Sequence, residues 1–222
     1  MDLNRPEEAI AESQRAIALD PKQSQFYKTI RTSQLKLGQA ADALASWRQM
    51  LALNPPDHGE WDGYAELCPF LDRPDEYREA RQTLLKRFGN TTDPSIAERT
   101  GRSCLFLEAT PDELQQATAL IDLALNHESP QARGYRHYYR FAKGLAECRA
   151  GRYESASKYV DSDTLRVLGP APRQLLSMIQ HRLNRSEEAR QNYEAAIAAF
   201  DWNLEKARTA DIWRYHLLRR EA

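Results

Sequence analysis

Apolar and polar positions follow a helical spacing along most of the chain, and the arrangement recurs at intervals of about 34 residues. The segment "LKLGQAADALASWRQMLALNPPD" at 35–57 shows one full unit, with Gly38, Ala43, Trp47 and Pro55 at its key positions. One period earlier, the ending "AIALDP" falls in the same register as "MLALNP". The pattern therefore predicts a chain built from repeated units.

The same offsets return in the second half of the chain. In "AGRYESASKYV" they are kept by Gly151, Tyr153 and Ala156, and in "LNRSEEARQNYEAAIAAF" by Ala189, Tyr193 and Ala196. Strand-like alternation does not accompany them. We therefore expect helices throughout.

Each unit has the features of two antiparallel helices. Glycine or asparagine ends the first helix, because the residue after a helix often needs a left-handed backbone. The small alanine five residues later allows the two helices to cross closely, and the aromatic residue one turn further on fills the space toward the next unit. Proline then stops the second helix.

This pattern resembles the tetratricopeptide (TPR) repeat family over essentially the whole chain. The resemblance implies an all-α fold, a right-handed α-solenoid of antiparallel helix pairs. On this register residues 1–222 form a single solenoid: a half repeat at 4–20, helix pairs at about 24–54, 57–88, 94–128, 135–162 and 171–200, and a C-terminal helix at about 203–220.

Two units depart from the pattern. In the unit at 57–88, Ala80 comes three residues late and Pro69 cuts the first helix short, so we expect a longer turn at "PFLDRP". The half repeat at 4–20 lacks its first helix. Because a solenoid needs polar caps, the chain is expected either to be a fragment of a longer protein or to use this short polar helix as its cap.

A narrower resemblance covers "EYREARQTLLKRFGNTTDPSIAERTGRSCLFL" at 76–107 and the tail "DIWRYHLLRREA". Both look like parts of the C-terminal TPR regions of large bacterial serine/threonine protein kinases and related multidomain proteins. The resemblance implies a non-catalytic arm, because the chain has no glycine-rich loop, no VAIK lysine and neither HRD nor DFG.

Charge and composition narrow the possible partners. The 31 lysines and arginines nearly balance the 32 aspartates and glutamates, which gives little long-range attraction for nucleic acid or an anionic membrane. RNA binding by a helical repeat array is disfavoured for the same reason. The N-terminus is polar, and no run of apolar residues is long enough to span a bilayer. We expect a cytoplasmic protein.

Motifs that could carry chemistry are incomplete. Ser155 and Lys158 have SxxK spacing but lack the SDN and KTG elements of acyl-serine enzymes, and Asp161 with Asp163 supplies too few oxygens for a cation. The five histidines show neither HxxxH nor HExxH spacing, and the three cysteines form no CxxC pair. We therefore expect no enzyme activity, no cofactor and no metal.

The candidate site is the concave groove that first helices line in TPR solenoids. The resemblance places these residues there: Lys28, Asp62, Glu66, Arg99, Arg102, Phe106, Tyr138, Phe141, Gln174 and Met178. Such a groove changes from mixed charge to basic and then aromatic, which favours a ligand with acidic and apolar residues. A shift of one position would exchange groove for core, above all among the aromatic residues of 133–144.

One established type of TPR site does not fit. Chaperone-binding TPR proteins resemble one another in a clamp for two carboxylates, and here Lys28 matches it whereas Thr32 and Gly63 do not. The leading hypothesis is a protein-interaction module that binds a protein or peptide, or another segment of its parent chain, within a larger bacterial signalling or scaffold protein. The alternative is a structural spacer or self-association module, with the "WRYHLLRR" helix packing on a neighbour.

Overall fold

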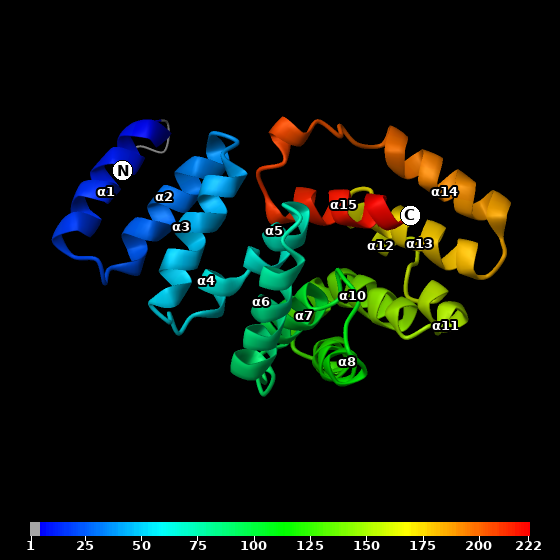
Figure 1. Cartoon of the computed structure of the whole chain (residues 1–222). Coiled ribbons are helices and arrows are strands. Elements are labelled where there is room, and N and C mark those ends of the chain that lie inside the picture. Colours follow the sequence, from blue (N-terminus) through cyan, green and yellow to red (C-terminus); the bar gives the residue numbers. More distant parts are fainter. Residues whose placement is uncertain (1–4) are drawn as a thin grey trace.

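The computed structural model describes residues 5–222, and its ordered elements within that range are helices. They follow one another as antiparallel pairs along a curved array, from the N-terminal helices at one end to the pair α13 and α14 at the other (Figure 1). The predicted all-α fold class and the stacking of helix pairs are confirmed. The fold is a TPR-like α-solenoid.

The first helices pack in sequence order. Helix α1 (Pro6–Leu19) lies against α2 (Ser24–Lys36), which pairs with α3 (Ala40–Ala52). Gly38 makes the turn between α2 and α3 with φ of 77°, in the left-handed region that glycine adopts at low cost. Ala43 is fully buried at their crossing, and the indole of Trp47 reaches the next unit by donating to the Glu60 carbonyl at 2.7 Å.

The first helix of the next unit is divided in two. Helix α4 (His58–Trp61) and helix α5 (Tyr64–Phe70) are separated at Gly63, where φ is 89°, and α6 (Pro74–Phe88) follows as their partner. Pro69 lies in the last turn of α5, which ends at Phe70. The longer turn expected at "PFLDRP" is wrong, because only residues 71–73 separate α5 from α6. A Cβ at Gly63 would lie 2.9 Å from the Trp47 ring, so the break sits where the neighbouring tryptophan needs the space.

Helices α7 (Pro94–Ser103) and α8 (Pro111–Asn126) form the following pair. Both starts are capped as their sequences indicate: the Asp93 carboxylate accepts from two backbone N–H groups, and Thr110 forms a capping box with Glu113. The end of α7 is set by another helix. The buried hydroxyl of Tyr77 donates to the Ser103 carbonyl at 3.0 Å and accepts from the Phe106 N–H at 3.1 Å.

The C-terminal half completes the array. A short α9 (Pro130–Gly134) leads into α10 (Arg136–Arg149), whose partner α11 (Tyr153–Ser157) is only five residues long, and α12 (Thr164–Val167) follows. Helices α13 (Ala171–Arg182) and α14 (Ser186–Ala198) form the last pair. A 3-10 turn, η1 (Leu204–Lys206), precedes α15 (Ala210–Glu221), which begins later than the expected 203.

Candidate functional site: the concave face and the C-terminal helix

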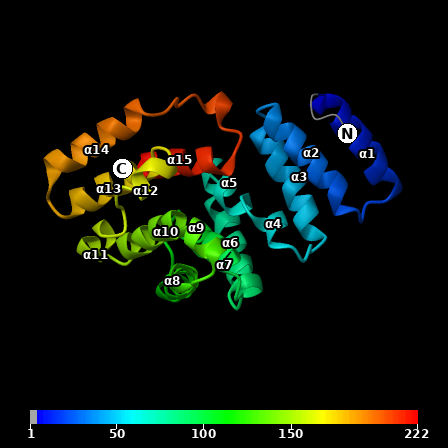
Figure 2. The same cartoon turned by 180° about the vertical axis from the view of Figure 1, so that it is seen from behind.

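The helix α15 lies across the inner side of the array. We call the inner surface formed by α5, α7, α10 and α13 the concave face. Helix α15 makes its main contacts with α5 near one end of this face and with α13 near the other. In both views it closes the arc that the paired helices describe (Figures 1 and 2). The segment that follows the last helix pair therefore occupies the surface predicted to bind a ligand.

Apolar side chains anchor α15. Trp213 is 1% exposed, its ring lies 6.3 Å from that of Phe70 on α5, and its indole N–H donates to the Ala207 carbonyl at 2.7 Å. Leu217 and Leu218 are buried as well. Because each such side chain contributes about 1.5–3 kcal/mol when fully buried, these three hold the helix by several kcal/mol before ordering costs are counted.

A buried ionic cluster joins α15 to α5 and α7. The Glu66 carboxylate is fully buried, and its Oε1 accepts from the Ser103 hydroxyl at 2.8 Å, from Arg102 Nη1 at 3.4 Å and from Arg214 Nη1 at 3.5 Å. Arg102 also donates from Nε to Glu98 at 2.5 Å. Two guanidinium groups therefore share one carboxylate from different helices.

The pKa values of the two arginines differ because their neighbours differ. Burial opposes the charge of Arg102, but the carboxylates of Glu98 and Glu66 outweigh it and raise its pKa. For Arg214, burial and then the positive charge of Arg102 lower the pKa to about 10, against the attraction of Glu66. Both groups remain charged at neutral pH, so Arg214 stays attracted to Glu66 and repelled by Arg102.

Hydrogen bonds to backbone atoms fix the position of α15 along the face. Gln174 on α13 donates from Nε2 to the Tyr215 carbonyl at 3.0 Å. Arg220 donates to the carbonyls of Pro69 and Phe70 at 3.2 and 3.1 Å, which satisfies acceptors at the end of α5. At the same end of α15, Arg149 pairs with Glu221 at 2.7 Å. Each of these contacts depends on the register of the helix.

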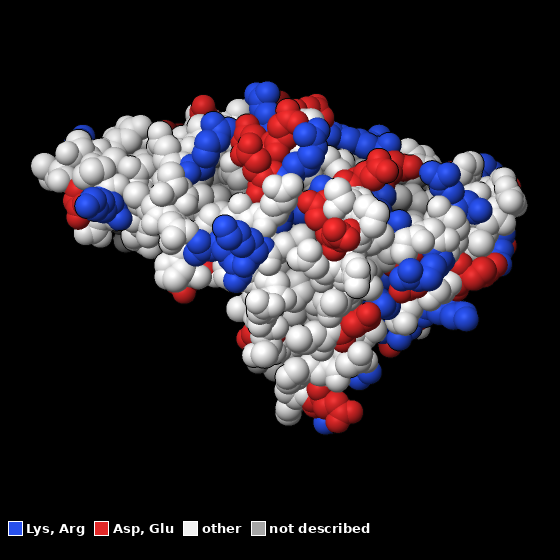
Figure 3. Space-filling model, turned by 60° about the horizontal axis from the view of Figure 1, so that its bottom comes forward, with Lys and Arg blue, Asp and Glu red and all other residues white. Residues whose placement is uncertain are grey.

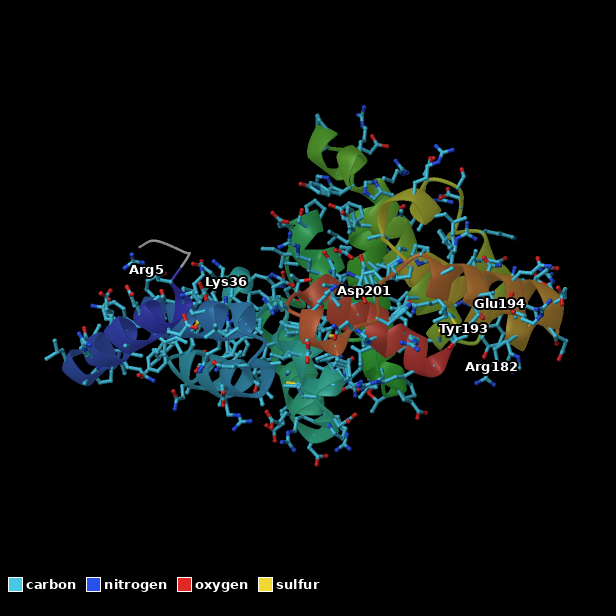
Figure 4. The ribbon with its side chains drawn as sticks, turned by 90° about the horizontal axis from the view of Figure 1, so that it is seen from above. Arg5, Lys36, Arg182, Tyr193, Glu194 and Asp201 are labelled. Carbon is cyan, nitrogen blue, oxygen red and sulfur yellow. The ribbon has the colours of Figure 1, made fainter. Side chains whose placement is uncertain are left out.

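The segment 199–209 carries the chain from α14 back to the start of α15. Seen from above, Asp201 lies over the middle of the molecule, between Lys36 on one side and Glu194 of α14 on the other (Figure 4). Arg208 donates to the Lys36 carbonyl at 2.5 Å, and Lys206 pairs with Asp201 at 2.6 Å. This segment therefore spans the distance between the end of α14 and the start of α15.

The predicted groove residues divide into five groups. Glu66 and Gln174 are covered by α15. Asp62, Arg99, Arg102 and Tyr138 line a cavity of about 490 Å³ beside the start of α15, to which α15 adds Asp211 and Arg214. Met178 lines a second cavity, of about 700 Å³, near the other end of α15. Lys28 lies apart from these cavities and donates to Glu60 at 2.8 Å.

Phe106 and Phe141 form the fifth group. They are 1% and 3% exposed and belong to the hydrophobic core, so the structure contradicts their placement in an open groove. For Phe106 the cause is the early end of α7, because the residue lies beyond Ser103 in a turn held by Tyr77. Phe141 is part of the aromatic segment in which groove and core positions are easily exchanged.

Residues of α15 are the part of the site that the repeat pattern missed. Trp213, Arg214 and Tyr215 lie outside any unit, although one signal was available in the sequence. The apolar residues Ile212, Trp213, Leu217 and Leu218 spread around more than half of a helix, which indicates burial on more than one side.

Charges on the molecular surface alternate in sign. Lysine and arginine side chains are interspersed with aspartate and glutamate on the face in Figure 3, and the part formed by α1–α3, at the left, carries few of either. Local pairs, rather than a field of one sign, therefore govern what this face attracts.

The environments of the three cysteines keep their thiols protonated. Cys68, Cys104 and Cys148 are buried, and burial raises the pKa of each thiol, to about 12 for Cys68. No group of three or more metal-binding side chains gathers within residues 5–222. Within the same range, no helix has the length and apolar character that crossing a membrane requires.

No protein-family model matches the chain, and no curated protein matches it. Similar solved structures include the MamA protein, with a TM-score of 0.47 and 14% identity over 79% of this chain and 91% of that one.

Two further similar structures belong to complexes. The Naa15/Naa10 complex bound to HypK-THB gives a TM-score of 0.41 at 19% identity, covering 88% of this chain and 29% of that chain. The APC/C hetero-tetramer Cut9–Hcn1 gives 0.43 at 12% identity, covering 97% and 46%. The chain thus spans less than half the length of these last two. At these scores, the fold assignment rests on the helix pairs themselves.

Proposed function

We propose that the chain is a non-catalytic protein-interaction module whose concave face binds a helical segment of a protein partner, with its own C-terminal helix occupying that face in the conformation described above. The single observation that carries the proposal is the seating of α15. It has a buried aromatic anchor, arginine–carboxylate pairs and backbone contacts, which are the features of a helix bound in a groove.

The packing of α15 supports its role as an occupant of the face. A helix that simply extended the array would stack on the preceding pair, as α7 and α8 follow α6. Instead, α15 makes main contacts with α5, about 150 residues earlier in the chain, and with the first helix of the last pair. An intramolecular ligand of this kind also fits the proposal that the natural partner is another segment of a longer parent protein.

The remaining parts of the proposal come from the sequence. The resemblance of 76–107 and the tail to bacterial kinase-associated TPR regions leads us to place the module in a larger bacterial signalling or scaffold protein in the cytoplasm. The non-catalytic role is favoured because the charged groups of the concave face are paired with one another, as Arg102 is with Glu98. The self-association alternative requires α15 to leave its place, since Trp213 and Leu218 are covered within the chain.

The experiment uses a fluorescein-labelled peptide with the sequence of residues 209–222 and the full chain as receptor. In the wild-type chain the tethered helix competes at an effective concentration in the millimolar range, so we expect weak binding. The substitution Trp213→Ala removes the anchor of the tethered helix, at a cost of about 3–5 kcal/mol, and leaves the face intact. We expect the variant to bind the peptide at least tenfold more tightly by fluorescence anisotropy.

Two controls make the result specific. Leu204→Ala changes an exposed side chain of the return segment and should bind like the wild type. A peptide in which the tryptophan is replaced by alanine should bind neither protein. If the Trp213→Ala chain remains folded by circular dichroism yet binds the peptide no better than the wild type, the concave face does not accept a separate helix and the proposal is wrong.

A further inference from the structure

We propose that the cavity beside the start of α15 binds a cationic side chain, a lysine or arginine, of the partner protein. This inference rests on the proposed function, because it assigns a ligand chemistry to the open part of the same concave face. We name this space the tyrosine cavity and define it by Asp62, Arg99, Tyr135, Tyr138, Asp211 and Arg214.

The position of the cavity follows from how α15 crosses the face. The helix rests mainly on α5 and α13, and residues of α7 and α10 line the space left beside its first turn. The volume of about 490 Å³ falls within the range of ordinary ligand sites, roughly 300–1,000 Å³. A ligand can therefore enter this part of the face while α15 remains in place.

The charges that can reach a ligand are mainly negative. Arg102, Arg214 and Glu98 have side chains only 8%, 14% and 5% exposed, and they are engaged in the buried ionic cluster. The charged side chains that remain accessible are Asp62 at 28%, Asp211 at 61% and Arg99 at 50%. The accessible charges of the cavity are therefore two carboxylates and one guanidinium.

The accessible ion pair is exchangeable. Arg99 Nη1 lies 3.4 Å from Asp62 Oδ2, a long contact between partly exposed groups. Pairs of this kind contribute about 0–1 kcal/mol, so an incoming cation can take the place of Arg99 at little cost. Asp211 is already paired with Arg214, but most of its side chain faces solvent and can accept a second donor.

Aromatic rings supply the second attraction. Tyr135 is 48% exposed and its ring lies 6.0 Å from that of Tyr138. Elsewhere in the chain guanidinium groups lie over aromatic rings, for example Arg31 over Trp47 at 4.0 Å and Arg219 over Trp202 at 4.7 Å. Among residues 5–222, no such cation covers Tyr135 or Tyr138. His137 lies against Tyr138, with ring centroids 4.4 Å apart, so the exposed ring of Tyr135 is the main aromatic surface available for a cation from a partner.

The test compares two labelled peptides, Gly-Arg-Gly-Arg-Gly and Gly-Glu-Gly-Glu-Gly, binding to the full chain by fluorescence anisotropy at low ionic strength. We expect the arginine peptide to bind and the glutamate peptide not to. Asp62→Asn and Tyr138→Ala should each weaken the arginine peptide about twofold to fivefold, as the loss of one exposed charge pair or one cation–π contact requires. Arg99→Ala should strengthen it, because a competing cation is removed.

A matched control separates the site from general charge attraction. Asp75→Asn removes the same charge from an exposed position on α6, away from the tyrosine cavity, and should leave binding unchanged. The proposal is overturned if Asp75→Asn weakens binding as much as Asp62→Asn, or if neither peptide binds. It is also overturned if the glutamate peptide binds and Arg99→Ala abolishes that binding, which would make this an anion site.

The cationic-ligand proposal and the proposed function can fail separately. The exchange experiment with the 209–222 peptide probes the surface under α15, whereas the arginine peptide probes the space beside it. If the arginine peptide does not bind but the helix peptide binds tightly to Trp213→Ala, the proposed interaction module stands and only the cationic ligand is wrong.

Discussion

At the scale of single residues, buried polar groups determine where helices end and how they meet. Tyr77 is fully buried on α6, and its hydroxyl bonds to the last carbonyl of α7 and to the N–H of Phe106. One side chain thus ends the neighbouring helix and positions the turn after it. Burial raises the pKa of Tyr77, so the hydroxyl stays protonated and able to donate.

The substitution Tyr77→Phe tests this arrangement. It keeps the ring but leaves a buried carbonyl and a buried N–H without their partner, which costs about 1–3 kcal/mol. We expect urea denaturation to show a lower free energy of unfolding by this amount. Tyr135→Phe, at an exposed position, should change little. Equal stabilities for the two variants would mean that the Tyr77 hydroxyl does not hold this turn.

Protonation of His216 provides a second test at this scale. His216 lies on α15 between the rings of Phe70 and Trp202, and burial, followed by the charges of Arg219 and Arg220, lowers its pKa from 6.5. The folded state therefore prefers the neutral ring. This contribution to stability is complete above the unfolded value of 6.5 and is lost as the pH falls through the lowered folded value.

We expect His216→Phe to reduce the pH dependence of stability in that window. The replacement keeps an aromatic ring but cannot be protonated, so the free energy of unfolding should fall less below pH 6.5 than in the wild type. His58, also buried with a lowered pKa, continues to titrate in both proteins and serves as the internal reference. Identical pH profiles for the two chains would show that His216 does not contribute.

At the scale of elements, a small residue at the helix crossing allows the two helices of a pair to pack closely. Ala43 and Ala156 are both fully buried, at the positions where the repeat pattern predicts close contact. A larger side chain would force the helices apart, and overpacking costs about 1–3 kcal/mol. We expect Ala43→Trp or Ala156→Trp to lower the melting temperature measured by circular dichroism.

Ala45→Trp is the matched comparison for Ala43→Trp. Ala45 lies on the same helix but is exposed, so a tryptophan there meets solvent. If Ala43→Trp and Ala45→Trp melt at the same temperature as the wild type, Ala43 does not lie at a tight crossing and the repeat register is wrong.

Element boundaries show what the sequence could and could not predict. The left-handed turns at Gly38, Gly151 and Asn184 follow from local backbone preferences, so the repeat offsets were sufficient to anticipate them. The end of α7 and the break at Gly63 depend on Tyr77 and Trp47, which come from other elements. Local spacing does not contain such information, and the placement of Phe106 was wrong for this reason.

The candidate site could likewise be predicted from the sequence only in part. Asp62, Arg99, Arg102 and Tyr138 were assigned to one concave surface by their positions in first helices, and they do line one cavity. That Arg214 completes the cluster around Glu66 could not be foreseen, because the two residues are 148 positions apart and α15 belongs to no repeat. Contacts across the interior of the array depend on how far the whole molecule curves.

At the scale of the whole molecule, α15 converts an open array into a closed arc. It links α5 with α13, so the concave face is partly covered and the remaining access runs beside its two ends. The helices α1–α3 lie outside this arc (Figure 1). The central claim is therefore that α15 is held on the face as a unit that can leave it while the paired helices remain folded.

Hydrogen–deuterium exchange of the full chain, wild type against Trp213→Ala, tests this claim most directly. We predict that the backbone amides of α15 are protected in the wild type and exchange much faster in the variant, accompanied by those of α5, whereas α2, α3 and α8 keep their protection. Uniform loss of protection in every helix of the variant, or an α15 that is unprotected in the wild type, would contradict a separable helix on the concave face.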